Sequence, residues 1–350
     1  MHREGTPRQR PGSAAAYADL RSPSPHPALT APSLGLEPVS ACLACQHVGR
    51  TPWRTTRAMM HAGDQRFSFA RCDACGLVYL DPRVPRGALS QYYPAAYLPY
   101  RGPGAWGRWS RWVAAGLRAT DRKRVARVRQ HSQLDASTRV LDVGCGRPTF
   151  LEAVGRAAAC DRVGMDFSDE GWRDDPARWA DLQLHRGDLS ELTSRLAGPF
   201  GVITMWHYLE HDYAPGDTLA RLLRLSTPET RLIIEVPDHG AWSRRRYGDD
   251  WAGYHTPRHT ALWDRDTMRV LLERSGWVVE SIEPHGTLDP WVLVWMSHQE
   301  RARLDWSKSM EPRFAGFMLG RIFAWPLLAL QARVRRQGGN GFVTAVARPA

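Results

Sequence analysis

At Val140-Leu-Asp-Val-Gly-Cys-Gly-Arg-Pro-Thr-Phe-Leu151, an apolar strand runs into a Gly-x-Gly turn and then into a helix. The glycines at 144 and 146 let the backbone approach a bound nucleoside that any Cβ would push away. A dinucleotide fingerprint needs a third glycine at position 149, where this chain has Thr149. Asp142, just before the turn, suits a cationic cofactor better than a pyrophosphate. The turn therefore indicates a nucleoside site without a pyrophosphate.

Two further carboxylates follow the next two strands of the predicted sheet. Asp166 ends the second strand, where it can accept hydrogen bonds from both hydroxyls of a ribose. Asp188 follows the third strand and can accept from an exocyclic adenine amine, while Leu189 packs on the ring. Any one of these acids alone has an ordinary structural explanation. Three of them in register, with a glycine turn at the first, predict an adenosine pocket.

Short β runs alternate with helical stretches from residue 139 onward. The patterns predict strands over 139–143, 162–166, 182–186, 200–206, 231–236 and 277–282, and helices over 150–159, 215–225 and 264–275. Asp264 is the expected N-cap of the last helix. A final strand over 341–347 comes late, which places an insertion at 284–340. This alternation predicts an α/β fold with a parallel sheet covered by helices on both faces.

The motifs resemble those of class I S-adenosylmethionine-dependent methyltransferases. The matching runs are Leu-Asp-Val-Gly-Cys-Gly (141–146), Val-Gly-Met-Asp (163–166), Gly-Asp-Leu (187–189) and Trp-His-Tyr-Leu-Glu-His (206–211). The resemblance covers 138–285 and the closing strand, and it implies a Rossmann-like seven-stranded sheet whose last strand is antiparallel. It also implies S-adenosyl-L-methionine as the cofactor. The candidate cofactor residues are Asp142, Gly144, Cys145, Gly146, Asp166, Phe167, Asp188, Leu189 and Trp206.

By this resemblance Gly144 and Gly146 line the methionyl end of the cofactor, Asp166 holds the ribose and Asp188 reaches the adenine. The chain departs from the family at Pro148, where a third glycine is usual. Proline is tolerated in the first turn of a helix. We therefore expect an altered turn rather than a lost pocket.

Two C-x-x-C pairs precede this domain. Cys42, Cys45, Cys72 and Cys75 can close a tetrahedral Zn²⁺ site with no open position, which makes the zinc structural rather than catalytic. The arrangement of a zinc-ribbon-like module, a Tyr-rich stretch and a methyltransferase core resembles bacterial sugar C-methyltransferases. That resemblance implies a carbohydrate-type acceptor and a lid, for which Tyr92, Tyr93 and Tyr97 are candidates. Packing in the core is the equally open alternative for these tyrosines.

Histidines supply the candidates for proton removal from the acceptor. His207 and His211 follow the fourth strand, and Tyr254, His255 and His259 lie in the loop after the fifth. The second group resembles the Tyr-His-x-His element of the sugar C-methyltransferases, although its histidines are four residues apart. By that resemblance His259 is the first choice for the general base, with Tyr254 and His255 contacting the acceptor. A pair of these histidines could also bind zinc, but the sequence suggests no third ligand for the ion.

The domain boundaries follow from composition. Residues 1–38 are rich in Pro, Ser and Arg and are expected to be disordered; 39–85 form the zinc-binding module, 86–135 the Tyr-rich lid and basic helical linker, and 136–350 the methyltransferase domain. With no apolar stretch near the N-terminus and only short apolar runs elsewhere, we expect a cytoplasmic chain. The sequence does not indicate an oligomeric state.

The net charge of +11 is a weak sign of nucleic-acid binding. Lys123 and Lys308 are the only lysines among 47 basic residues, and such an excess of arginine is what a biased coding composition would produce. The run Met205-Trp-His-Tyr208 also lacks the Asn/Asp-Pro-Pro-aromatic pattern of nucleic-acid N-methyltransferases. The apolar helix near 314–328 is expected to pack on the core rather than rest on a membrane or form a dimer face.

The sequence thus predicts a methyltransferase for a small-molecule or carbohydrate-type acceptor. Two alternatives stay open. One is a non-catalytic adaptor with a degenerate cofactor pocket beside Pro148. The other is an RNA-directed methyltransferase or binder that uses the zinc module and the arginines.

Overall fold

The computed structural model describes residues 35–94, 97–334, 339 and 341–350. The disordered lead-in expected over 1–38 lies outside the described residues as far as position 34. Within the described residues, the backbone of Glu37 exchanges two hydrogen bonds of 2.9 Å with that of Arg83. The ordered module therefore begins before residue 38.

A seven-stranded sheet in the order β10-β11-β8-β7-β4-β5-β6 forms the larger part of the fold. Its strands are β4 (Arg139–Val143), β5 (Asp161–Asp166), β6 (Gln183–Arg186), β7 (Phe200–Trp206), β8 (Ser226–Pro237), β10 (Trp277–Glu283) and β11 (Phe342–Pro349). Strands β4 to β8 pair in parallel, whereas β11 lies antiparallel between β8 and β10. The predicted Rossmann-like sheet with an antiparallel last strand is confirmed.

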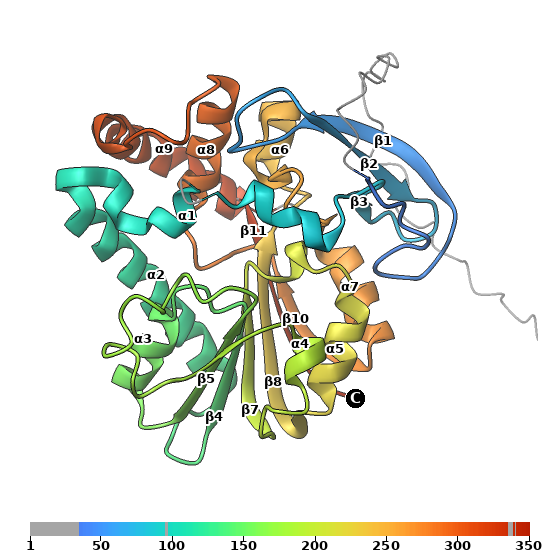
Figure 1. Ribbon diagram of the computed structural model, residues 1–350, viewed down its shortest axis with the longest axis vertical. Helices are drawn as coiled ribbons and strands as arrows, with labels where there is room; N and C mark the ends of the chain where they lie inside the picture. Colours follow the sequence, from blue (N-terminus) through green and yellow to red (C-terminus); the bar gives the residue numbers. More distant parts are fainter. Residues whose placement is uncertain (1–34, 95–96, 335–338, 340) are drawn as a thin grey trace, which may run out of the picture. The chain divides into compact units, whose positions relative to one another are not determined.

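Helices cover both faces of this sheet (Figure 1). Because successive side chains of a strand point to opposite faces, β4 gives Leu141 and Val143 to one apolar layer and Val140 to the other. Helices α4 (Leu189–Leu192), α5 (Pro215–Leu223) and α7 (Arg265–Arg274) pack on the first layer. Helices α2 (Ser110–His131) and α3 (Thr149–Ala157) pack on the second. The carboxyl ends of the parallel strands are the edge where a ligand binds in such folds.

The start of α7 shows the predicted capping. A side-chain oxygen of Asp264 accepts the backbone N–H of Thr267 at 2.9 Å, and the backbone N–H of Asp264 donates to Oγ1 of Thr267 at 3.0 Å. This capping box satisfies two backbone donors that the helix itself leaves unpaired. The element begins where the sequence indicated.

A second, antiparallel sheet carries the cysteines in the order β1-β2-β3-β9. Its strands are β1 (Arg50–Arg57), β2 (Arg66–Cys72), β3 (Val78–Leu80) and β9 (Ala261–Leu262). Strand β9 comes from the loop after β8, so a segment some 180 residues downstream completes the sheet of the cysteine module. This strand was not predicted from the sequence, because two residues carry no periodicity.

The insertion between β10 and β11 contributes α8 (Pro290–Arg301) and α9 (Phe314–Val334). The inner side of α9 packs into an aromatic cluster, in which Trp109 stacks on Phe314 with ring centroids 4.7 Å apart. On its outer side Ile322, Phe323 and Trp325 are more than half exposed. The expected packing on the core thus holds for one side of the helix only. Among the described residues, no helix combines the length and apolar character needed to cross a bilayer.

Short helices lie in the connections between these elements. They are α1 (Leu98–Arg101) in the aromatic stretch and α6 (Trp242–Tyr247) in the loop after β8, together with the 3₁₀ segments η1 (Arg86–Tyr92), η2 (Gly102–Trp109), η3 (Leu209–His211), η4 (Gly248–Asp250), η5 (Ala252–Tyr254) and η6 (Glu311–Arg313). Segments η1, η3 and η5 lie next to the residues that the sequence singled out for chemistry.

Candidate functional site

The glycine turn after β4 has the backbone that glycine alone adopts readily. Gly144 and Gly146 have φ angles of 75° and 48°. A Cβ on Gly144 would lie 2.4 Å from a ring carbon of Tyr208, whereas nothing beyond its chain neighbours lies within 4 Å of the Cβ position of Gly146. Gly171 packs on the carbonyl of Gly146, and a Cβ on Gly171 would lie 2.2 Å from that oxygen. The turn is therefore closed by Tyr208 at Gly144 and by Gly171 at the carbonyl of Gly146, and it is open at the Cβ position of Gly146. Helix α3 begins directly after Pro148, so the proline ends the turn without breaking the helix.

Asp166 lies beside this turn at the end of β5. Its carboxylate accepts the backbone N–H of Gly146 at 2.9 Å and that of Ser168 at 3.0 Å. Burial nevertheless raises the pKa of Asp166 above its ordinary value. Each oxygen keeps a further lone pair, so the carboxylate can accept hydroxyl donors while it holds the turn.

Asp188 has partners of its own. It caps α4 by accepting the N–H of Ser190 at 3.2 Å, and it forms an ion pair with Arg86 of η1. Leu189 is fully buried beside it. An adenine amine at Asp188 therefore has to share the carboxylate with Arg86.

Asp142 is almost fully buried and accepts a hydrogen bond of 2.7 Å from Thr204 on the neighbouring strand β7. Burial raises the pKa of Asp142 to about 7, and the hydrogen bond from Thr204 only partly opposes this.

Trp206 ends β7 with its ring 5.5 Å from Phe150 and 5.1 Å from the guanidinium of Arg124. Cys145 is buried, and Phe167 is 60% exposed. The candidates thus lie along four adjacent strand ends.

Histidines from two loops meet at the same edge. The ring centroids of His211 and His259 are 4.6 Å apart, and those of His255 and His259 are 5.0 Å apart. Nδ1 of His259 lies 2.8 Å from the carbonyl of Gly253, and Nδ1 of His211 lies 3.1 Å from that of Arg258. Because a carbonyl only accepts, both Nδ1 atoms must carry the proton. Three of the predicted histidines are therefore brought together.

His207 lies between two buried carboxylates. Its Nδ1 is 3.5 Å from Glu210, and its Nε2 is 3.3 Å from Glu235. Burial opposes the charged imidazole, but the two glutamates together raise the pKa of His207 to about 9. In contrast, burial lowers the pKa of His259 to about 3 and that of His255 well below its ordinary value. His207 is the charged member of the group near neutral pH, while His255 and His259 are neutral.

Tyr254 does not join the histidines. It is fully buried and packs edge-on against Trp251, with Phe69 of the cysteine module 5.7 Å away. The aromatic side chain is therefore part of the core under the second sheet, and its contact with an acceptor stays a prediction.

In the Tyr-rich stretch, Tyr92 lies in the core, whereas Tyr93 and Tyr97 lie over the site. Tyr92 is fully buried on Phe67 of the cysteine module. Tyr93 lies 5.8 Å from Phe167, next to Asp166, and its hydroxyl is 3.3 Å from Nδ1 of His211. The hydroxyl of Tyr97 is 2.7 Å from Nε2 of His255. Tyr93 and Tyr97 therefore cover the edge that carries the acidic residues and the histidines.

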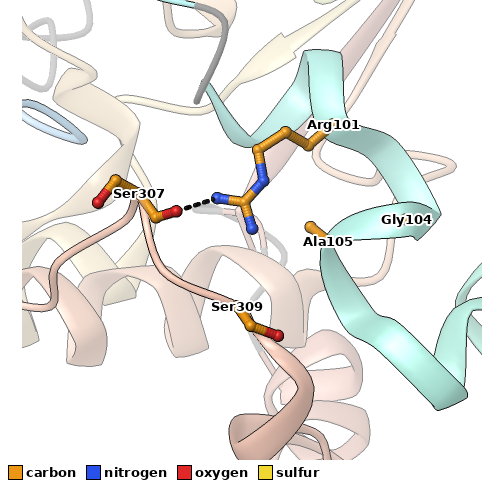
Figure 2. Close-up of a pocket in the computed structure, with 5 residues that line it drawn as sticks. All are labelled: Arg101, Gly104, Ala105, Ser307 and Ser309. Atoms are coloured by element: carbon orange, nitrogen blue, oxygen red, sulfur yellow. Dashed lines mark hydrogen bonds between the residues drawn. The ribbon is translucent and has the colours of Figure 1, made fainter.

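Two cavities are lined by residues of the aromatic stretch and of the insertion. The larger, of about 730 Å³, is lined among others by Tyr97, His61 and Arg57. The smaller, of about 440 Å³, contains Arg101, whose guanidinium donates to the backbone carbonyls of Trp306, Ser307 and Lys308. Figure 2 shows the bond to Ser307. These bonds tie the aromatic stretch to the insertion and occupy the arginine. Tyr97 is thus the residue that joins the larger cavity to the histidines.

The four cysteines of the C-x-x-C pairs form one cluster. Their Sγ atoms lie within 4.8 Å of one another, with 3.5 Å between Cys42 and Cys75 and between Cys45 and Cys72. None of the four is in a disulfide. Sulfur atoms around a tetrahedral zinc ion with Zn–S bonds of about 2.3 Å are roughly 3.8 Å apart, so the cluster fits such an ion.

Matching backbone turns present these thiols. The N–H of Gln46 donates to the carbonyl of Cys42, and the N–H of Gly76 donates to that of Cys72, both at 3.0 Å. Gln46 and Gly76 both have positive φ angles. The two C-x-x-C segments thus form equivalent turns around the cluster.

Sequence reasoning missed two residues that organise the site. Arg258 is completely buried and donates to the carbonyls of Met59, Met60 and Tyr92. Glu210 lies within the quoted Trp-His-Tyr-Leu-Glu-His run, but only the fold brings it within 3.9 Å of Nε2 of His259. No local signal reveals these contacts, because the partners are far apart in the chain.

Part of the chain is similar to known methyltransferases. Residues 115–282 match a family described as a methyltransferase domain. A ubiquinone biosynthesis O-methyltransferase from Methylococcus capsulatus is 31% identical over 116 residues, which are 32% of this chain and 48% of that protein. The chain thus spans about half the length of this curated relative.

Solved structures with a similar arrangement are more distant. A chain in the complex of the Haloferax volcanii Trm112 methyltransferase activator with a putative methyltransferase aligns at 17% identity over 71% of this chain and 97% of that one, with a TM-score of 0.45. An S-adenosylmethionine-dependent methyltransferase from Mesorhizobium loti aligns at 17% identity over 64% and 96%, with a TM-score of 0.41. Likeness of this size says nothing about the acceptor.

Proposed function

Residues 115–282 are a methyltransferase domain, and from this we propose that the protein transfers a methyl group from S-adenosylmethionine to a small-molecule or carbohydrate-type acceptor. The observation that carries the proposal is the open side of the turn at Gly146, bordered by Asp166. A nucleoside can approach the backbone there, and the carboxylate can accept its ribose hydroxyls. Phe167, Asp188 and Leu189 are proposed to hold the adenine, and Asp142 to face the cationic end.

We assign proton removal to the histidines of the loop after β8. Of the three neighbouring rings, His255 is the one whose nitrogen contacts a residue of the larger cavity, Tyr97. In the proposed step the acceptor oxygen or carbon forms a bond to the methyl carbon while the carbon–sulfur bond breaks. The acceptor proton passes to the Tyr97 oxygen as the Tyr97 proton passes to Nε2 of His255. The sulfonium becomes the neutral thioether of S-adenosylhomocysteine.

The cysteine cluster is proposed to hold a structural Zn²⁺. Four thiolates leave no position for substrate, so the ion stabilises the module and takes no part in methyl transfer. The sheet that it supports includes β9, which directly follows the loop with His255 and His259. The metal thereby supports the loop that carries His255, the proposed proton acceptor.

Binding of S-adenosylhomocysteine to the full chain, measured by calorimetry, tests the cofactor site. Asp166→Asn should weaken binding about tenfold or more, because a carboxylate is the better acceptor for two ribose hydroxyls. Asp161→Asn is the matched control at the other end of the same strand and should bind as the wild type does. If the wild type does not bind the ligand at millimolar concentration, the non-catalytic adaptor is the better description.

A further inference from the structure

Glu210 is a buried carboxylate without a conventional partner. Its side chain is 2% exposed, and neither of its oxygens has a hydrogen-bond partner among the described residues. The nearest nitrogens are Nδ1 of His207 at 3.5 Å and Nε2 of His259 at 3.9 Å. The imidazolium of His207 offsets the charge of Glu210, but both carboxylate oxygens still lack a hydrogen bond and keep lone pairs for a further partner.

The facing imidazole nitrogen of His259 cannot supply a proton. Its Nδ1–H is used by the carbonyl of Gly253, which leaves a lone pair on Nε2 toward Glu210. His211 is held in the same way by the carbonyl of Arg258. Two neutral imidazoles and a carboxylate therefore present electron pairs to one another in a buried space. A cation between them removes the conflict.

We propose that Glu210, His211 and His259 bind a divalent transition-metal ion, separate from the cysteine cluster. One carboxylate oxygen and one nitrogen of each imidazole lie within 4.8 Å of one another. Ligand atoms that surround an ion at about 2.1 Å are roughly 3 to 3.5 Å apart, so the three side chains close by about 1 Å on binding. In the described part of the chain only this group and the four cysteines come so close.

The surroundings match those of metal-binding imidazoles elsewhere. Such histidines donate their second ring N–H to a backbone carbonyl or a carboxylate, which fixes the ring, as His211 and His259 do here. Two histidines and one carboxylate suit Zn²⁺, Fe²⁺, Co²⁺ or Mn²⁺ and leave positions open for another ligand. The proposal that the ion binds here does not depend on the proposed function. Its use to lower the pKa of an acceptor hydroxyl next to His255 rests on that function.

Titration with Co²⁺ of full-length protein that carries one zinc ion per chain tests the site, because four thiolates bind zinc more tightly and the cysteine cluster is then filled while the second site is free. The wild type should take up one equivalent of Co²⁺ and develop weak d–d absorption without the thiolate charge-transfer bands of a cysteine site. Glu210→Gln and His259→Gln should each bind Co²⁺ more than about 100-fold more weakly, since even loss of a supporting hydrogen bond costs 10- to 100-fold. His298→Gln is the matched control, because His298 is exposed on α8.

If a variant does not fold, the Co²⁺ titration of the wild type alone is sufficient to test the proposal. No uptake of Co²⁺ beyond the cysteine cluster at up to about 1 mM overturns the proposal, as does binding by Glu210→Gln with wild-type affinity. Binding of S-adenosylhomocysteine, measured on the same preparation, separates the two proposals. Absence of S-adenosylhomocysteine binding contradicts the proposed function, whereas absence of Co²⁺ uptake contradicts the metal site.

Discussion

At the scale of single residues, Asp142 links cofactor binding to pH. Its pKa of about 7 means that the free protein holds a proton on this side chain for much of the population at neutral pH. A sulfonium and an ammonium nearby favour the ionised carboxylate, so binding of S-adenosylmethionine should release that proton. Affinity should therefore rise by up to about tenfold per pH unit below pH 7 and level off above about pH 8.

Calorimetry in two buffers of different ionisation enthalpy measures the released proton directly. Asp142→Asn cannot ionise, so its affinity should be flat between about pH 6 and pH 8. S-adenosylhomocysteine lacks the sulfonium and should show a smaller pH dependence with the wild type. An affinity of the wild type for S-adenosylmethionine that does not change with pH contradicts the role of Asp142.

The choice between His255 and His259 as general base is also decided at this scale. Tyr97→Phe removes the hydroxyl that contacts His255, and His255→Gln removes the acceptor nitrogen. Each should lower kcat by about 100-fold or more with little change in cofactor affinity, because general-base groups contribute 10²- to 10⁴-fold. Tyr100→Phe, in the same aromatic cluster, is the matched control. If His259→Gln alone abolishes turnover while both other variants stay active, the base is His259.

At the scale of elements, the sequence predicted what is local. The strands over 139–143 and 200–206 coincide with β4 and β7, since apolar runs bounded by turn residues are encoded within the element itself. Asp264 was identified as an N-cap for the same reason, because its partner is three residues away. The two C-x-x-C pairs likewise carry their own spacing signal.

The contacts that complete the site are not local, and the sequence did not predict them. Strand β9 has two residues and exists because β3 offers it unpaired backbone groups, with the N–H of Leu80 donating to the carbonyl of Thr260 at 2.9 Å. The third partner of the histidine pair, Glu210, lies 49 positions before His259 in the chain. The burial of Tyr254 was not predicted, because a tyrosine beside a histidine has the same sequence pattern whether it faces a ligand or the core.

At the scale of the whole molecule, the cysteine module and the methyltransferase domain share the loop that carries the histidines. The N–H of Met59 donates to the carbonyl of Thr256 at 2.8 Å, and Arg258 bonds the carbonyls of Met59 and Met60. On the other side, the N–H of Thr260 donates to the carbonyl of Glu210 at 2.7 Å. The loop is thus held between the two sheets, while the glycine turn and Asp166 belong to the larger sheet alone.

Removal of the structural zinc should therefore separate catalysis from cofactor binding. Without the ion the cysteine turns lose their common ligand, the sheet β1-β2-β3-β9 loosens, and the histidine loop loses one of its two supports. Treatment with a strong chelator should speed hydrogen exchange at the amides of Met59 and Leu80, with amides in β4 as the internal control. S-adenosylhomocysteine should still bind, while methyl transfer falls. Because the chelator also empties a site at Glu210, His211 and His259, Cys45→Ser provides the same test without removing that ion. Unchanged exchange at Met59 and Leu80 in both cases means that the cysteine module does not hold the loop.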